Sequence, residues 1–298
     1  MSAGPLIFDR KLLRRRRSRA SALGPARFLL ERAALDLADR VAAVLRHFPL
    51  ALDLGTPGDE VRAALAGLDS IGAIIAVNAI GEGLRAARFV AADEEALPFA
   101  DGTFDLVVSA LALQFVNDLP GTLVQIKRAL RPDGLFLAAL LGGETLTELR
   151  QSFAAAESEI EGGLSPRVAP FADLRDLGAL LQRAGFALPV ADSDRVIVRY
   201  ESAFALMHDL RRMGAANPLI DRRRTPLKRA TLMRMAEIYA RRFADADGRV
   251  RATFELMWLS GWAPHPSQQR PLRPGSAQAR LAQALGTHEW SAGEKAGE

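Results

Sequence analysis

Residues 93–150 read DEEALPFADGTFDLVVSALALQFVNDLPGTLVQIKRALRPDGLFLAALLGGETLTELR, and this stretch decides the fold class of the chain. Two short apolar runs, residues 104–109 and 135–141, each follow a turn that contains Asp and Gly, as buried strands do. A helix is predicted between them, because Asp118 is a good N-cap, Pro120 suits a first turn and apolar residues recur at helical spacing. Two buried strands joined by a helix predict a βαβ unit of a parallel sheet.

The same alternation of strands and helices continues on both sides of this stretch. Further strands are predicted at residues 50–54, 73–77, 88–92, 196–200 and 252–259. Further helices are predicted at residues 60–68, 144–160, 173–184, 203–213 and 227–243, with an amphipathic helix before the first strand. This order predicts an α/β, doubly wound, mostly parallel sheet of seven strands, with an N-terminal helical arm and helical additions in the C-terminal half.

The pattern divides the chain into three parts. Residues 1–48 are predicted to form a basic arm and a helix, and residues 49–262 the α/β domain, with a helical insertion at about 201–245. Residues 263–298 are rich in Pro, Gln, Gly and Ser, which predicts a loop-rich, partly disordered tail.

The composition is that of an ordinary globular protein. The chain has 298 residues, of which 49% are hydrophobic and 25% charged, enough for one large domain or a domain with an insertion. It contains no cysteine, which excludes disulfides and thiolate nucleophiles and favours a reducing compartment. No apolar run has the length of a membrane span and no secretory signal pattern is present, so we expect a cytoplasmic protein.

Basic residues cluster in two segments, residues 10–19 and 222–229. Such clusters bind nucleic acid, an anionic membrane surface or an acidic protein, or they form a solvated arginine-rich helix or a flexible arm. No aromatic residues alternate with the arginines, so binding of nucleic acid by base stacking is not expected. The membrane surface and the acidic protein stay open as partners.

A glycine-containing loop follows the first predicted strand and reads Asp53-Leu54-Gly55-Thr56-Pro57-Gly58. Glycines let the backbone approach a ligand closely, and the following helix directs partial positive charge at it. A second candidate region is residues 109–116, where the chain leaves the fourth strand at its carboxyl end, the place where ligands collect in open α/β sheets. A plain strand-to-helix turn is the alternative interpretation of the glycine loop.

Metal and hydrolase sites are not indicated. The four histidines, His47, His208, His265 and His288, are scattered without a metal-binding spacing, so no metal site is predicted. The sequence contains no GxSxG elbow, which argues against a hydrolase.

The stretch from residue 93 resembles the second half of the class I S-adenosylmethionine (SAM) dependent methyltransferases, which have a Rossmann-like fold. The resemblance lies in the LPF…FDLVVS strand and in the turn Leu130-Arg131-Pro132-Asp133-Gly134. Further segments resemble one branch, the complex I (NADH dehydrogenase) assembly factor 5 family and its bacterial relatives. Among them are FDR at 8–10, FVNDLP at 115–120, GGETL at 142–146 and EGG at 161–163. This resemblance covers most of residues 6–277.

The resemblance implies how SAM would be bound. The cofactor-binding residues it indicates are Asp53, Gly55 and Gly58 at the methionine part, Asn78 at the ribose, Asp93 or Glu94 at the adenine amine, and Ser109, Leu111 and Gln114 at the sulfonium side. Pro57 replaces the family's middle glycine, and Asn78 replaces its usual acid, so weaker SAM binding is expected. A solvated surface loop is the alternative for residues 93–95. No catalytic residue is assigned.

The resemblance also implies a function. It is that of an enzyme that modifies a protein side chain, an arginine of a respiratory complex I subunit, by methyl transfer or hydroxylation. Methyl transfer mainly requires positioning, so the lack of an obvious base does not exclude it. The alternatives are a non-catalytic complex I assembly chaperone on a degenerate fold and a methyltransferase acting on a carrier protein or a small molecule.

The position at which the family resemblance begins also predicts where the protein is located. It starts almost at Met1, so a bacterial cytoplasmic protein without a mitochondrial presequence is expected. Peripheral contact with the inner membrane is the alternative for its location.

Overall fold

The computed structural model of the chain describes residues 6–79, 88–269, 276 and 280–288. The chain divides into two compact units, Met1–Pro264 and His265–Glu298. The described part of the second unit contains a short helix, α9 (Leu281–Leu285), within the segment predicted as loop. No described helix is both long and apolar enough to cross a membrane.

A seven-stranded sheet forms the centre of the first unit. Its strands are β1 (Phe48–Leu54), β2 (Ile71–Asn78), β3 (Phe89–Ala91), β4 (Phe104–Ala110), β5 (Leu130–Leu141), β6 (Ala187–Tyr200) and β7 (Val250–Trp262). They lie in the order β3-β2-β1-β4-β5-β7-β6, and only β7 runs antiparallel to its neighbours. The prediction of a mostly parallel, seven-stranded sheet is therefore confirmed. The strand order reverses between β1 and β4, where open sheets of this kind bind their ligands.

Both faces of the central strands are buried. In β5, Leu135, Leu137 and Ala139 belong to the core on one face of the sheet, while Phe136 and Ala138 belong to the core on the other. A parallel strand that is covered on both sides has no polar face, which is why its sequence is a continuous apolar run.

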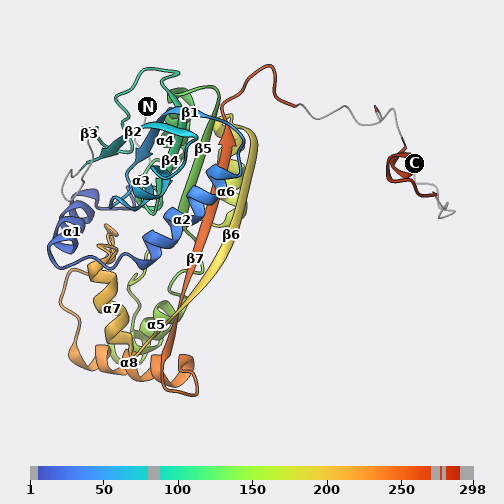
Figure 1. Cartoon of the computed structure of the whole chain (residues 1–298). Helices are drawn as coiled ribbons and strands as arrows, with labels where there is room; N and C mark the ends of the chain where they lie inside the picture. The colour runs from blue at the N-terminus through green and yellow to red at the C-terminus, as the bar shows by residue number, and fades with distance from the viewer. Residues whose placement is uncertain (1–5, 80–87, 270–275, 277–279, 289–298) are drawn as a thin grey trace. The chain divides into compact units, whose positions relative to one another are not determined.

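Helices cover the two faces and one end of the sheet. They are α1 (Arg10–Ala22), α2 (Phe28–Ala42), α3 (Glu60–Leu65), α4 (Leu119–Ala129), α5 (Thr147–Glu161), α6 (Leu174–Ala184), α7 (Ala203–Arg212) and α8 (Arg229–Phe243), with a 3-10 turn η1 (Leu113–Phe115). Apolar residues of α2 and α3 join one core and those of α4 and α6 the other. Figure 1 shows α5, α7 and α8 grouped at one end of the sheet, with α1 near α7.

Strand β6 is longer than the predicted residues 196–200. Asp192, Ser193 and Asp194 interrupt the apolar pattern in its first half, so the sequence did not indicate a strand there. Because β6 is an edge strand with partly exposed side chains, its extent follows from backbone pairing with β7 over most of its length rather than from apolar residues.

The N-terminal segment is a helix packed on the domain, which corrects the alternative of a flexible arm. Phe8 packs edge-on against Phe115, with 5.7 Å between the ring centres, and Leu13 is buried beside them. The side-chain oxygen of Asn117 accepts hydrogen bonds from the backbone N–H groups of Ile7 and Phe8, each at 2.8 Å. Helix α1 is thereby held beside the carboxyl end of β4.

Candidate functional site

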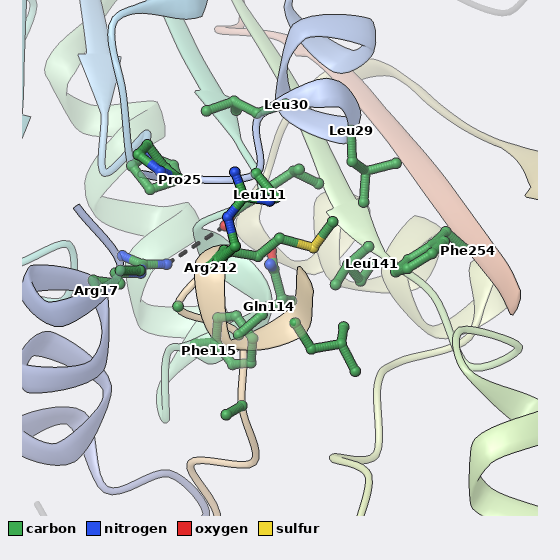
Figure 2. A pocket seen from close by; sticks show the side chains of 18 of the residues that line it. Arg17, Pro25, Leu29, Leu30, Leu111, Gln114, Phe115, Leu141, Arg212 and Phe254 are labelled. Carbon is green, nitrogen blue, oxygen red and sulfur yellow. Dashed lines mark hydrogen bonds between the residues drawn. The ribbon is translucent and has the colours of Figure 1, made fainter. Parts of the chain in front are cut away.

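A cavity of about 150 Å³ lies at the carboxyl ends of β1, β4 and β5. Figure 2 shows 18 of the side chains that line it, and the labelled ones come from α1, the connection from α1 to α2, α2, the loop after β4 with η1, β5, α7 and β7. Of the predicted cofactor-binding residues, four contribute to the lining: Gly58, Asn78, Leu111 and Gln114. The other five, Asp53, Gly55, Asp93, Glu94 and Ser109, lie outside it.

In the glycine loop after β1, Gly55 has a backbone conformation that favours glycine and Gly58 does not. Gly55 has φ +73°, and a Cβ there would lie 2.7 Å from Cγ of Glu94 and 3.0 Å from Cβ of Ala112. Gly58 has no such conformation, but a Cβ there would collide with the carboxylate of Glu60. The absence of a side chain at Gly58 therefore leaves room for the Glu60 carboxylate to fold over the loop.

Asp53 and Ser109 are buried behind the cavity and have partners within the protein. Asp53 accepts hydrogen bonds from the hydroxyl of Thr56 and from the guanidinium of Arg62. Its burial raises its pKa to about 6, although Arg62 acts in the opposite direction. Ser109 donates to the carbonyl oxygen of Leu54 at 2.7 Å and thereby joins β4 to β1. These hydrogen bonds stabilise the loop after β1.

Asn78 ends β2 and lies at the cavity wall. It is only 5% exposed, and its Nδ2 donates to the backbone carbonyl of Thr56 at 3.2 Å. Pro57 lines the cavity beside it and is itself exposed. The two residues that depart from the family pattern thus lie together on one wall.

The acidic residues 93–95 form ion pairs with α1. Arg10 pairs with Asp93 at 2.9 Å, with Glu94, and with Glu95 at 2.9 Å, and Arg14 also pairs with Asp93. Glu94 is only 3% exposed. The alternative of a solvated acidic loop is therefore wrong for Glu94, and the arginines of α1 are not all solvated, since Arg10 is 12% exposed.

The loop after β4 combines backbone strain with an unsatisfied polar atom. Leu111 adopts φ +51°, a left-handed conformation that is unusual for a residue other than glycine. Three residues later, Oε1 of Gln114 is buried and has no hydrogen-bond donor among the described residues. A buried acceptor of this kind is normally satisfied by a donor, which makes Gln114 a candidate ligand contact.

The sequence did not indicate the five charged residues of the cavity wall, which are Arg17, Arg27, Glu60, Arg167 and Arg212. Arg17 stands in a run of four arginines, and its neighbours in the run do not distinguish it. The only available signal was the helical spacing of Arg10, Arg14 and Arg17, which places them on one face of α1 opposite the acids.

Comparison with known proteins gives the family. Residues 52–138 match a family model described as a methyltransferase domain. The human mitochondrial protein named arginine-hydroxylase NDUFAF5 is 44% identical over 281 residues, which cover 91% of this chain and 81% of that protein. The chain belongs to the NDUFAF5 family.

Other similarities place the NDUFAF5 family among the class I methyltransferase folds. The malonyl-[acyl-carrier protein] O-methyltransferase of Laribacter hongkongensis is 41% identical over 191 residues, 64% of this chain and 62% of that enzyme. The solved structure of a candidate methyltransferase from Bacillus halodurans superposes with a TM-score of 0.52 at 18% identity, covering 78% of this chain and 99% of the other. The class I SAM methyltransferase fold expected from the sequence is confirmed.

Proposed function

We propose that this member of the NDUFAF5 family is an enzyme that binds SAM in the cavity and modifies an arginine side chain of a respiratory complex I subunit. The observation that carries the proposal is the 44% identity to a protein named arginine hydroxylase, which extends over 81% of that protein. Hydroxylation, the reaction that this name supports, adds one oxygen atom and needs an external oxidant, such as dioxygen with a two-electron reductant. Methyl transfer, its competitor, needs only SAM.

The residues of the cavity suit SAM. Gly55 and Gly58 keep the loop after β1 free of side chains, and Asn78 offers one amide oxygen near the end of β2 for a ribose hydroxyl. Bound SAM supplies an activated methyl group on a sulfonium centre.

An arginine substrate also matches the polar groups of this wall. A guanidinium has five N–H donors and no acceptor, so it needs oxygen acceptors around it. Gln114 contributes such an acceptor. In this proposal Gln114 orients the guanidinium, and the apolar residues Leu111 and Leu141 exclude water from it.

The test compares a deletion strain with strains that express the wild-type chain or a Gln114→Leu variant. We expect mass spectrometry of the complex I subunits to find an arginine that carries one extra oxygen atom only with the wild type. Gln151→Leu, on the exposed surface of α5, is the matched control and retains the modification. An arginine that gains one methyl group instead would select methyl transfer.

Two results would refute the proposal. An altered acyl carrier protein with unchanged complex I subunits would favour the carrier-protein methyltransferase. Normal complex I assembly by a chain that shows no heat of SAM binding at millimolar ligand would favour the non-catalytic chaperone.

A further inference from the structure

Arg17 is a buried cation on the cavity wall whose guanidinium lies over the ring of Phe115, 5.9 Å from its centre. Its side chain is 11% exposed, and Figure 2 shows it directed at the backbone oxygen of Leu111, which lies 3.5 Å from its Nη2. The nearest carboxylate that it reaches among the described residues is that of Glu94, at 4.0 Å. Arg10 already binds this carboxylate at closer range. Arg17 therefore shares an acid rather than having one of its own.

The environment of Arg17 favours an anion beside it. Burial lowers the pKa of Arg17, and the positive charges of Arg10 and Arg14 lower it further, while Glu94 opposes them. A buried charge is costly unless it is paired and hydrogen-bonded. A carboxylate that enters the cavity would complete the pairing of this guanidinium.

Glu60 is a negatively charged residue in the lining of the same cavity. Its side chain is 9% exposed, and its Oε1 accepts from Arg27 at 2.6 Å. Its Oε2 is buried and receives no hydrogen bond from any described residue. The carboxylate lies against Gly58 in the loop after β1. An ammonium group in the cavity would supply the missing donors.

We propose that Arg17 and Glu60 bind the two charged ends of the amino-acid part of SAM, Arg17 its α-carboxylate and Glu60 its α-ammonium. This inference rests on the proposed binding of SAM in the cavity. Arg17 lacks a carboxylate of its own and Glu60 keeps one oxygen without a described donor, and together these two groups match a zwitterion. The other charged residues of the lining, Arg27, Arg167 and Arg212, pair with Glu60, Glu157 and Asp209. The arginine side chain of a protein substrate can contact Gln114, but it has no free carboxylate and does not complete the pairing of Arg17.

The assignment differs from the acid that the sequence indicated. Asp53 lies outside the cavity, and its carboxylate already accepts from Thr56 and Arg62. Glu60 contributes a carboxylate to the cavity from the first turn of α3 instead. Because Arg17 belongs to α1, the N-terminal helix becomes part of the cofactor site.

The experiment measures binding by calorimetry with three ligands: SAM, decarboxylated SAM, and 5′-methylthioadenosine, which lacks the amino-acid part. We expect the wild type to bind SAM about tenfold to a hundredfold more tightly than decarboxylated SAM, the range of one hydrogen bond between charged groups. Arg17→Gln removes this preference. Glu60→Gln weakens SAM and decarboxylated SAM by about the same factor, since both retain the ammonium. Neither variant changes the affinity for 5′-methylthioadenosine.

Two control variants and a comparison of ligands on the wild type alone complete the experiment. Arg15→Gln, on the exposed side of α1, and Glu31→Gln, exposed on α2, should bind all three ligands as the wild type does. If Arg17→Gln retains the preference for SAM, the inference is wrong while the proposed function stands. A wild type that binds SAM and decarboxylated SAM equally also overturns it, even if Arg17→Gln does not fold. A wild type that binds none of the three overturns the proposed function as well.

Discussion

Substitution of Gly55 by alanine tests whether the loop after β1 is as closely packed as the structure indicates. Gly55 has φ +73°, and its backbone N–H donates to the carbonyl of Val77 at 2.7 Å, so the residue cannot move freely. An alanine Cβ at this position would lie 2.7 Å from Cγ and 2.9 Å from Oε1 of Glu94. Glu94 cannot move away without breaking its ion pair with Arg10. Both the backbone and the neighbour therefore oppose the substitution.

The expected loss of stability has two parts. A residue with a Cβ in the left-handed region costs about 1–2 kcal/mol. Overpacking of a close contact costs about 1–3 kcal/mol more. Gly102 provides the matched control, since it has φ +65° but no heavy atom within 4 Å of the position that an alanine Cβ would take. We expect Gly55→Ala to lower the free energy of unfolding by about 2–5 kcal/mol and Gly102→Ala by about 1–2 kcal/mol.

Urea unfolding followed by tryptophan fluorescence measures both variants. The difference between them isolates the contact with Glu94, because the backbone cost is common to the two positions. The same unfolding midpoint with the same slope in both variants would refute the close packing of Gly55 against Glu94.

Three further predictions concern buried polar contacts. Burial raises the pKa of Asp53 from 3.8 to about 6, so the folded chain binds a proton more tightly than the unfolded one. Stability should then fall by about 2 kcal/mol as the pH rises from 4 to 6, and titrated urea melts of Asp53→Asn should lack this slope. Asn117→Ala removes the acceptor for two backbone N–H groups before α1, so limited proteolysis should cleave that segment faster than in the wild type. An unchanged rate of cleavage contradicts this prediction. Thr253→Val removes one of two hydrogen bonds to the buried carboxylate of Glu148, which should lower the free energy of unfolding by about 1–3 kcal/mol. The thermal midpoint of the variant should therefore drop, and an unchanged midpoint argues against the contact.

The candidate site was predictable in part. Gln114 and Leu111 were found because they follow β4 at its carboxyl end, a place that the βαβ pattern already indicates. Asp53 and Ser109 were placed on the right strands, but their side chains face Arg62 and Leu54 rather than the cavity. Local sequence indicates the end of a strand, and the neighbours of each side chain there depend on contacts with other segments.

The pairing of the charged groups in and beside the cavity could not be predicted from local sequence. Arg10 and Glu94 are 84 residues apart in the chain, and their pairing exists only because α1 packs on the loop after β3. This packing leaves Arg17 with a shared acid, and the fold of Glu60 over Gly58 leaves one of its oxygens without a described donor. Charge runs and glycine motifs in the sequence do not reveal such pairings.

The sequence by itself determined the fold class. Continuous apolar runs, the cap at Asp118 and the turn before β4 act over a few residues, so they can be recognised in the sequence. Residues 132–134, predicted as a turn, lie within β5, where its pairing with β4 is irregular. The tertiary structure decided the extent of β6, the place of α1 and the polarity of the cavity. Each of these depends on backbone pairing or charge pairing between distant segments, and such contacts form only when the sheet brings those segments together.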